Sequence, residues 1–337
     1  LSHDLDEYPR PDYSMEAHHI MHNGRIQTLS KDIMKSCFEK STALQKIGLI
    51  AYQTMTGRGC PHKCTYCIND TLKEMYNNDN YLRWRSTAHV IDELLWAKEN
   101  LPYVGYILIS DDAFFARDKK SFEGFCKEYK EKINLPLSCL ASPMTISGEK
   151  MGMLVDAGLI DIQMGVESGS KKIQVLFNRK QMDNERLMKA FLIINKYKDR
   201  ILPPRYDFIL DVPYETDVDK IENLKLIAKI PKPFHIQAFS LVLYPRTKLY
   251  EQAKMDGLIA DEKKEIYNRS YAAPDLNYLN LLISVSKNGR FPSAFLKFLV
   301  SPPIVKILNN GYLRPFFRYL YLSLKNINRL IKNGKTG

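Results

Sequence analysis

Short apolar runs alternate with longer stretches of mixed polar and apolar residues between about positions 48 and 257. The runs are apolar throughout, which is typical of strands that are buried on both faces of a parallel sheet. Each mixed stretch between them has the length of a helix. The sequence therefore predicts six strands, at 48–55, 104–110, 135–141, 159–166, 205–212 and 234–244.

Helix start and stop signals support this pattern. Ser147, Asp183 and Thr216 are N-cap residue types in front of mixed stretches, and Gly158 and Gly257 are typical of helix ends. The predicted helices lie near 87–100, 118–133, 147–157, 183–198, 216–229 and 246–257. Six strand–helix units predict an α/β fold with a parallel sheet, and both a doubly wound sheet and a partial barrel fit this count.

The composition places the chain among ordinary globular proteins, because 45% of its 337 residues are hydrophobic and 26% are charged. It excludes a disordered chain, a collagen-like repeat and a disulfide-rich mini-protein. The net charge of +11 is unevenly distributed. Residues 276–337 contain ten Lys and Arg but no Asp or Glu, whereas the preceding residues carry almost equal numbers of both signs.

These patterns divide the chain into three parts. Residues 1–47 are polar and form a linker or N-terminal extension, 48–257 form the core, and 258–337 form a helical, basic C-terminal extension. No apolar run approaches the ~20 residues of a spanning helix, and the polar start is not a signal peptide. We therefore expect a cytoplasmic protein, and because the chain does not begin with Met we expect it to be a fragment or an excised domain.

Three of the six cysteines, Cys60, Cys64 and Cys67, stand within eight residues after the first predicted strand. Six scattered cysteines do not form a disulfide framework, so this spacing indicates a metal site in a reducing compartment. An iron–sulfur cubane normally takes four thiolates, and three leave one iron open for a ligand. Gly57 and Gly59 would let the backbone approach such a cluster.

A Cys₃His zinc site that uses His62 is the alternative for this segment. Structural zinc sites usually draw their ligands from two separated pairs, and the chain has no second pair. The remaining cysteines are isolated in the sequence, and we expect them to be small buried hydrophobic residues. They are Cys37, Cys126 and Cys139.

Cys60, Cys64 and Cys67, with the aromatic Tyr66 before the third cysteine, resemble the signature of the radical S-adenosylmethionine (SAM) enzymes. The resemblance implies that the three cysteines hold a [4Fe–4S] cluster whose fourth iron binds the amino and carboxylate groups of SAM. It also implies reductive cleavage of SAM to methionine and a 5′-deoxyadenosyl radical. The implied fold is a (βα)₆ partial TIM barrel, which agrees with the six units of the pattern.

Two acidic segments resemble SAM-binding motifs of the same family. Asp111 and Asp112 follow the second predicted strand, where the family binds the SAM amino group, and Asp112 is the first candidate. Glu167, in the segment Gly165 to Gly169, resembles the residue that contacts the ribose hydroxyls, as a carboxylate does in dinucleotide sites. The alternatives are a helix-start pair for the two aspartates and a helix-capping acid for Glu167. The resemblance assigns Tyr66 to the SAM site as well.

The chain departs from the family pattern after the fifth and sixth strands. Asp211, Tyr214 and Arg246 stand where the family usually has glycine. These substitutions make backbone contact with the adenine less certain, and Arg246 either contacts SAM or an anionic substrate or faces solvent. Arg179 and Lys180 could pair with a carboxylate, although each by itself is more typical of a solvated face.

The segment from Asp4 to Tyr13 resembles the linker that follows a cobalamin-binding domain in the cobalamin-associated branch of the superfamily. Many members of that branch are methyltransferases, so the resemblance implies methyl transfer to an organic substrate and a one-electron reductant such as ferredoxin or flavodoxin. The cobalamin motif D-x-H-x-x-G is absent from the 337 residues. Any cobalamin would therefore be bound by a domain outside this chain.

Residues 287–337 interleave basic and aromatic residues. This mixture suits an interfacial helix on anionic lipid, and Leu313, Phe316, Phe317, Leu320 and Leu324 fall on one helical face. The same mixture also suits nucleic acid, which we consider the weaker interpretation, or a helix that packs on the core with a solvated basic face. We expect membrane-surface contact or a lipid-like substrate if the face is used for binding.

Two other functions compete with this interpretation. A tRNA-modifying radical SAM methylthiotransferase would need a second three-cysteine cluster and an RNA-binding β-barrel, and the isolated cysteines and helical tail disfavour it. A zinc-stabilised scaffold that binds lipid or RNA without catalysis would need only the Cys₃His site. Metal analysis separates that scaffold from a radical enzyme.

Overall fold

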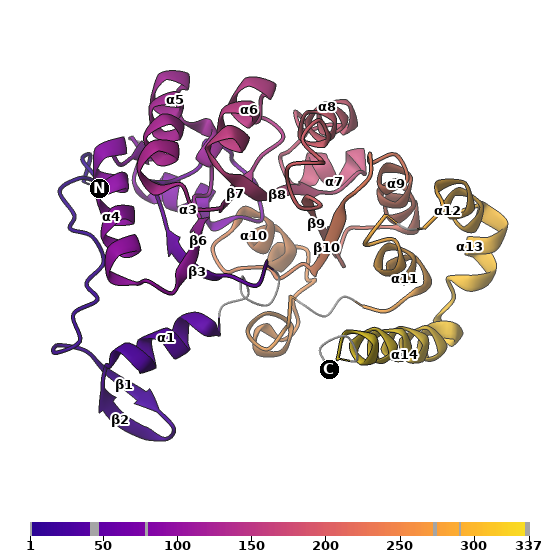
Figure 1. Cartoon of the computed structure of the whole chain (residues 1–337). Coiled ribbons are helices and arrows are strands. Elements are labelled where there is room, and N and C mark those ends of the chain that lie inside the picture. The colour runs from indigo at the N-terminus through magenta and orange to yellow at the C-terminus, as the bar shows by residue number, and fades with distance from the viewer. Residues whose placement is uncertain (1, 41–46, 78–79, 272–274, 290, 334–337) are drawn as a thin grey trace. The chain divides into compact units, whose positions relative to one another are not determined.

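The computed structural model describes residues 2–40, 47–77, 80–271, 275–289 and 291–333, with side chains as far as Ser323. All six predicted strands are present and form one sheet in the order β10-β9-β8-β7-β6-β3 (Figure 1). A sheet in strict chain order has no topological switch point, so it is the partial-barrel arrangement and not the doubly wound one. The strands are β3 (Ile50–Thr54), β6 (Val104–Ile109), β7 (Leu137–Ala141), β8 (Leu159–Glu167), β9 (Arg205–Leu210) and β10 (His235–Ser240).

The chain divides into two compact units. Unit 1 comprises Leu1–Pro61, Tyr76–Ile162 and Asp199–Leu202, and unit 2 comprises His62–Met75, Gln163–Lys198 and Pro203–Gly337. In this division each extension packs with a part of the core, and the boundaries near residues 47 and 257 stay a prediction. Parallel pairing joins β3 to β6 and β6 to β7 in unit 1, and β8 to β9 and β9 to β10 in unit 2.

Helices of unit 1 begin where the sequence places their caps. Ser86 caps α4 (Thr87–Asn100), Asp118 caps α5 (Lys119–Glu128) and Ser147 caps α6 (Gly148–Ala157). The short helices η1 (Phe114–Ala116) and η2 (Tyr129–Ile133) flank α5. Buried aromatic side chains fill the space between these elements, with Phe114 contacting both Phe122 and Phe125.

The N-terminal residues, predicted to be a linker or N-terminal extension, contain secondary structure of their own. Residues 19–28 form a hairpin of β1 (His19–His22) and β2 (Arg25–Thr28), followed by α1 (Lys31–Glu39). Asn23 and Gly24 both have positive φ, as a two-residue hairpin turn requires. Cys37 on α1 is exposed, which corrects its predicted burial, whereas Cys126 and Cys139 are buried as expected.

Residues 2–14 run as a strap along α4. Tyr13 stacks on Trp96 with ring centroids 5.6 Å apart, and Arg10 lies 5.2 Å from the same ring. Asp6 accepts a hydrogen bond from the backbone of Ser86 and pairs with His89 at 3.2 Å. The sequence predicted an extended linker for these residues, and the contacts show that residues 2–14 are packed against unit 1.

Unit 2 builds its core from α7 and the ends of its strands. Ile173, Phe177, Val212, Leu241 and Leu249 form a buried cluster. Asp183 caps α8, and Thr216 with Asp219 forms a capping box at α9, as predicted. The helices of this part are α3 (Ile68–Met75), α7 (Lys171–Leu176), α8 (Asn184–Asn195), α9 (Asp217–Ile227), α10 (Lys248–Met255) and η3 (Lys263–Tyr267).

The C-terminal extension is helical, as predicted. It consists of α11 (Tyr278–Val285), α12 (Ser293–Leu299), α13 (Pro302–Leu308), η4 (Gly311–Leu313) and α14 (Arg314–Asn333). Buried Tyr278 of α11 packs on Phe317 of α14. None of the described helices is both long and apolar enough to cross a bilayer.

Candidate functional site

The segment that carries the cysteines is held to unit 2 at Thr65. The Thr65 hydroxyl donates to the Leu176 carbonyl at 2.7 Å, and its amide donates to the Phe177 carbonyl at 3.2 Å. The Thr65 carbonyl in turn accepts from the amide of Leu249 at the start of α10. These bonds satisfy carbonyl groups that the end of α7 leaves open, so the position of Cys64 and Cys67 is set by two helices distant in sequence.

Two glycines before the first cysteine are required by packing. A Cβ on Gly57 would lie 2.2 Å from the Trp84 ring, and one on Gly59 would lie 2.3 Å from the Tyr81 carbonyl. Gly59 also has a φ of +90°, which L side chains rarely adopt. Both positions belong to or follow β4 (Gly57–Arg58), which pairs with β5 (Arg83–Trp84). The glycines therefore allow the start of the cysteine segment to pack against β5. The sequence had predicted a different reason for them, the close approach of the backbone to a cluster.

Within the described residues, no group of three or more His, Cys, Asp or Glu side chains is already gathered around a common metal position. Cys60 belongs to unit 1, and Cys64 and Cys67 belong to unit 2. The donor set nevertheless fits an iron–sulfur cluster, since three cysteines outside any disulfide stand within eight residues on a glycine-bounded segment. His62 is half-buried, and burial with nearby Arg179 and Lys73 lowers its pKa to about 4, which keeps its ring neutral.

Arg179, which the sequence assigned to a solvated face, is buried beside the cysteine segment. Its guanidinium donates to the Gly165 carbonyl at 2.6 Å and lies 3.7 Å from Cys64 Sγ and 3.5 Å from the Tyr66 hydroxyl. Only 6% of its surface is exposed. Burial opposes the charge, but Tyr66, Glu167 and Cys64 together raise the pKa of Arg179, so it is a fixed cation next to a cysteine sulfur.

Glu167 is the acidic partner in this cluster. Its carboxylate lies 3.9 Å from Arg179, and burial raises its pKa although Arg179 and the Tyr66 hydroxyl oppose the rise. Ser170, and not Glu167, caps the following helix α7, which removes the capping interpretation of Glu167. Tyr66 is half-buried and makes an edge-on contact with Phe177, and desolvation raises the pKa of its hydroxyl. The structure thus brings together Tyr66 and Glu167, two of the predicted SAM contacts.

The predicted pair Asp111 and Asp112 separates into a buried and an exposed residue. Asp111 accepts hydrogen bonds from the amide and the hydroxyl of Thr56, at 2.6 and 2.5 Å. Arg117 donates to the same Thr56 hydroxyl at 2.8 Å and to its carbonyl. Asp111 is therefore occupied within unit 1, and the exposed Asp112 is the member of the pair with a carboxylate open to a ligand.

Two of the three residues that replace family glycines, Asp211 and Arg246, have a backbone conformation that favours glycine, whereas Tyr214 does not. Asp211 and Arg246 have φ values of +57° and +72°, in the left-handed region that glycine occupies without strain. Asp211 is held there by hydrogen bonds from the Asp275 amide and the Asn280 side chain, both 2.8 Å. The Arg246 side chain is exposed, while its carbonyl accepts from Thr71. The glycine-like backbone is preserved at these two positions although the side chains differ.

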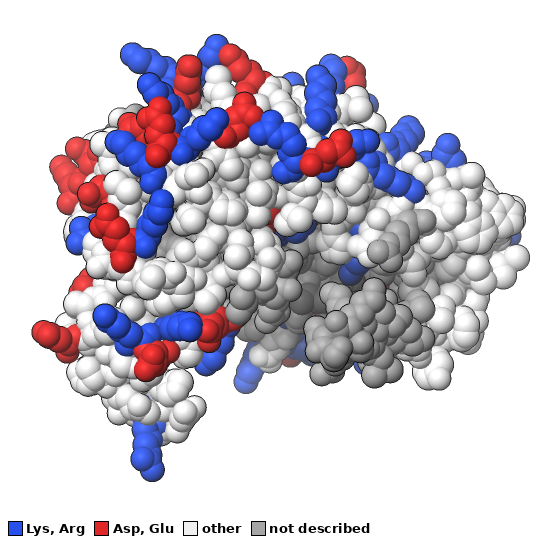
Figure 2. Space-filling model, viewed as in Figure 1, with Lys and Arg blue, Asp and Glu red and all other residues white. Residues whose placement is uncertain are grey.

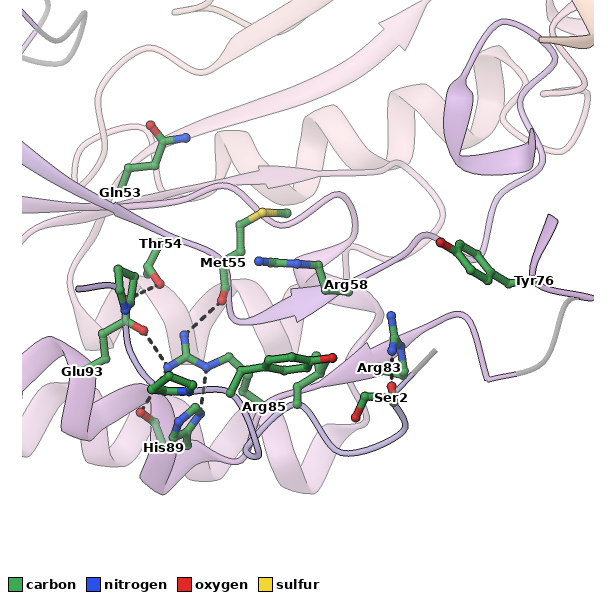
Figure 3. A pocket seen from close by; sticks show the side chains of 14 residues that line it. Ser2, Gln53, Thr54, Met55, Arg58, Tyr76, Arg83, Arg85, His89 and Glu93 are labelled. Atoms are coloured by element: carbon green, nitrogen blue, oxygen red, sulfur yellow. Dashed lines mark hydrogen bonds and ion pairs between the residues drawn. The ribbon is translucent and has the colours of Figure 1, made fainter. Parts of the chain in front are cut away.

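Unit 1 contains a cavity of about 860 Å³, lined by the N-terminal strap, the end of β3 and α4 (Figure 3). Arg85 at its base is neutralised by Glu93 at 2.6 Å and donates to the Met55 carbonyl. Arg58 and Arg83 also line the cavity and donate to the carbonyls of Gly57 and Ser2. This volume is typical of a small-molecule site, and the excess positive charge suits a ligand with an acidic group.

The comparisons with known proteins agree with this site. Residues 54–227 match the model of the Radical SAM superfamily, which covers half of the chain. The chain therefore belongs to the radical SAM superfamily, whose members bind a [4Fe–4S] cluster and SAM.

Named relatives include an uncharacterised methyltransferase of Pyrococcus horikoshii, 23% identical over 78% of this chain and 51% of the relative. The bacteriochlorophyllide d C-8(2)-methyltransferase of Chlorobaculum tepidum is 25% identical over 63% of this chain and 46% of the relative. The radical SAM methyltransferase TsrM of Kitasatospora setae shares the fold, with a TM-score of 0.50 and 14% identity over 62% of this chain and 39% of that protein. The chain thus spans about half the length of the curated relatives that it matches.

Proposed function

We propose that this chain carries the radical SAM core of a cobalamin-associated methyltransferase that acts on an organic substrate. The observation that carries the proposal is the cluster of buried Arg179 with half-buried Glu167 and Tyr66 against Cys64. A scaffold gains little from a cation beside a thiol and a strained glutamate, because both are costly to bury. The methyltransferase names of two relatives support methyl transfer.

In this proposal Cys60, Cys64 and Cys67 hold the [4Fe–4S] cluster. When bound, the cluster supplies the electron that cleaves SAM to methionine and a 5′-deoxyadenosyl radical. Arg179 offers fixed positive charge to a carboxylate, and Glu167 accepts hydrogen bonds from hydroxyl groups. Tyr66 packs on Phe177 and excludes water from the buried side of the site. Asp112 presents an open carboxylate suited to an amino group.

Cobalamin does not fit the residues of this chain, since the D-x-H-x-x-G motif is absent from its sequence. We therefore derive no step from cobalamin and place its binding, if the reaction uses it, outside these residues. A one-electron reductant such as ferredoxin or flavodoxin completes the reaction. We also propose a cytoplasmic location with the protein peripheral to the membrane, which suits a lipid-like substrate.

Anaerobic reconstitution tests the proposal. The chain is expected to take up about four irons and four sulfides and to release 5′-deoxyadenosine from SAM when it is reduced. Cys60→Ser, Cys64→Ser and Cys67→Ser should each lose both properties. Cys37→Ser is the matched control, because Cys37 is an exposed cysteine outside the segment.

A zinc-loaded chain that takes up no sulfide and does not cleave SAM would overturn the proposal in favour of the Cys₃His scaffold. Equal iron and sulfide uptake in the three segment variants and in wild type would also overturn the ligand assignment. Product analysis by mass spectrometry with methyl-labelled SAM then distinguishes methyl transfer from other radical reactions.

A further inference from the structure

Large apolar side chains are exposed along α12, α13 and α14 of unit 2 and in the short helix η4 between α13 and α14. Tyr312 of η4 is 96% exposed and Tyr319 of α14 is 72% exposed, values that leave almost the whole ring in water. The others belong to α12, α13 and α14. Together these residues, which we call the aromatic face, are Phe295, Phe298, Ile307, Tyr312, Phe316, Tyr319 and Leu322.

The aromatic face is not left over from an incomplete core. Leu296 of α12, Val305 of α13 and Phe317 of α14 point inward and are buried, so each helix already has its own packing face. Phe317 contacts Tyr278 of α11 with ring centroids 5.5 Å apart. The outward residues are therefore additional, and exposed apolar surface of this kind marks an interaction site.

Part of the predicted apolar stripe of α14 is used for this internal packing. Phe317 is buried and Leu313 and Leu320 are half-buried, whereas Phe316 is exposed. The side chain of Leu324 lies outside the described residues. The structure thus shifts the candidate contact surface from the predicted stripe to Phe316 and Tyr319, together with α12 and α13.

Basic side chains lie on the same helices as the aromatic face. Lys297, Lys306 and Arg318 are exposed there, and Arg314 is exposed and lies 3.7 Å from the Asp275 carboxylate. The sequence from 276 to 337 contains no acidic residue. In the view of Figure 2 the surface over α12 and α13 shows no Asp or Glu, whereas both signs are mixed over α5 and α6. The surface is therefore electrostatically complementary to an anionic partner.

We propose that the aromatic face docks on the surface of an anionic lipid bilayer. Exposed Phe, Tyr, Ile and Leu next to Lys and Arg are the composition of interfacial helices, which bury apolar side chains among the headgroups while cations contact lipid phosphates. A second copy of the chain would bring two basic surfaces together. Nucleic acid would use the cations and the rings but would leave Ile307 and Leu322 without a partner.

This proposal rests on the proposed peripheral location and identifies the aromatic face as the surface that contacts the membrane. It does not require the radical chemistry, because lipid binding is measured with the cluster-free chain. A failure to bind lipid would leave the SAM cleavage test unaffected, and a failure to cleave SAM would leave the docking test unaffected.

Vesicle co-sedimentation of the full chain tests the proposal. We expect binding to vesicles of phosphatidylcholine mixed with phosphatidylglycerol, weak binding to phosphatidylcholine alone, and release as salt is raised. Lys297→Glu with Lys306→Glu should weaken binding roughly tenfold or more. Phe295→Ser with Phe298→Ser should reduce it by a similar factor, because both exposed rings are lost.

Matched controls use exposed residues on helices other than those of the aromatic face. Tyr267→Ser removes an exposed ring, and Lys225→Glu reverses an exposed charge. Both controls should bind vesicles like wild type, and circular dichroism should show that all variants are folded. Phe316→Ser with Tyr319→Ser provides a second, independent change on the next helix.

Three outcomes would overturn the proposal. The first is no binding to anionic vesicles at low salt, and the second is equal binding by the variants and wild type. The third is a dimer or an RNA complex that the aromatic-face substitutions disrupt, while the same variants bind vesicles as wild type does. Such a result would assign the aromatic face to a second copy or to RNA.

Discussion

Each unit has a buried arginine close to an acidic residue, Arg117 with Asp111 in unit 1 and Arg179 with Glu167 in unit 2, and the two arrangements are built differently. In unit 1, Arg117 donates to the carbonyl and hydroxyl of Thr56, and that hydroxyl donates to Asp111. In unit 2, Arg179 lies 3.9 Å from Glu167 and makes a short bond only to the Gly165 carbonyl. In unit 1, which we call the closed network, Arg117 and Asp111 are linked by hydrogen bonds through Thr56. In unit 2, which we call the open network, Arg179 and Glu167 lie 3.9 Å apart beside Cys64.

Backbone strain follows the same division. Among the described residues of unit 1, the non-glycine positions with positive φ are all asparagines, which tolerate this conformation. Unit 2 has Glu167, Asp211 and Arg246 in the same region of φ, besides one asparagine. Strain of this kind concentrates at functional sites. The comparison teaches that the non-asparagine residues with a strained backbone lie in unit 2, at or near the ends of its strands, where Glu167 also lies close to Arg179.

Disruption of the closed network is expected to give the largest loss of stability. Arg117→Met should lower the free energy of unfolding by about 3–5 kcal/mol, because it leaves Asp111 buried without its cation. Urea denaturation measures the loss. The double variant Arg117→Met with Asp111→Asn removes the orphaned charge and should recover part of it. An unchanged urea midpoint for Arg117→Met would show that the network does not hold unit 1 together.

The open network should respond less in stability and more in binding. Arg179→Met should cost about 2 kcal/mol in unfolding free energy, the value of one hydrogen bond from a charged group. After reconstitution it should weaken SAM binding roughly tenfold by loss of one charged contact, as measured by isothermal titration calorimetry. Arg179→Lys, which keeps the charge, should retain part of the affinity. A stability loss as large as that of Arg117→Met, with unchanged SAM affinity, would show that Arg179 has the same structural role as Arg117.

The smallest expected change in stability comes from replacing residues at positive φ by glycine. Arg246→Gly should leave stability unchanged or raise it by up to about 1 kcal/mol, since glycine adopts positive φ without a steric cost. Asp211→Gly should lower stability, because it removes the hydrogen bonds from Asp275 and Asn280. Thermal unfolding of both variants compares them directly. Destabilisation by Arg246→Gly would mean that the exposed Arg246 side chain makes a contact of its own.

Much of the fold was predictable because its signals are local. The six strands and the caps at Ser147, Asp183 and Thr216 are confirmed, since apolar runs and capping residues act over a few positions. The hairpin at Asn23 and Gly24 was missed although this dipeptide is a strong turn signal. The polar character of the flanking strands hid it, because they carry no buried face.

The candidate site was predictable only in part. The spacing of Cys60, Cys64 and Cys67 identified the cluster ligands as a hypothesis, because three thiols within eight residues have few structural uses. Nothing in the sequence distinguished Arg179 from an exposed arginine. Its burial depends on β8, on the end of α7 and on the cysteine segment that Thr65 binds to it.

The sequence by itself determined the α/β class, the order of the strands and helices, the cysteine spacing and the basic C-terminal extension. Each of these depends on residue type and on short-range spacing. Only the tertiary structure decided that Asp111 is occupied by Thr56 while Glu167 faces Arg179, and which aromatic residues of the C-terminal helices are exposed. Burial and pairing join residues that are far apart in the chain, so their outcome depends on packing and not on local pattern.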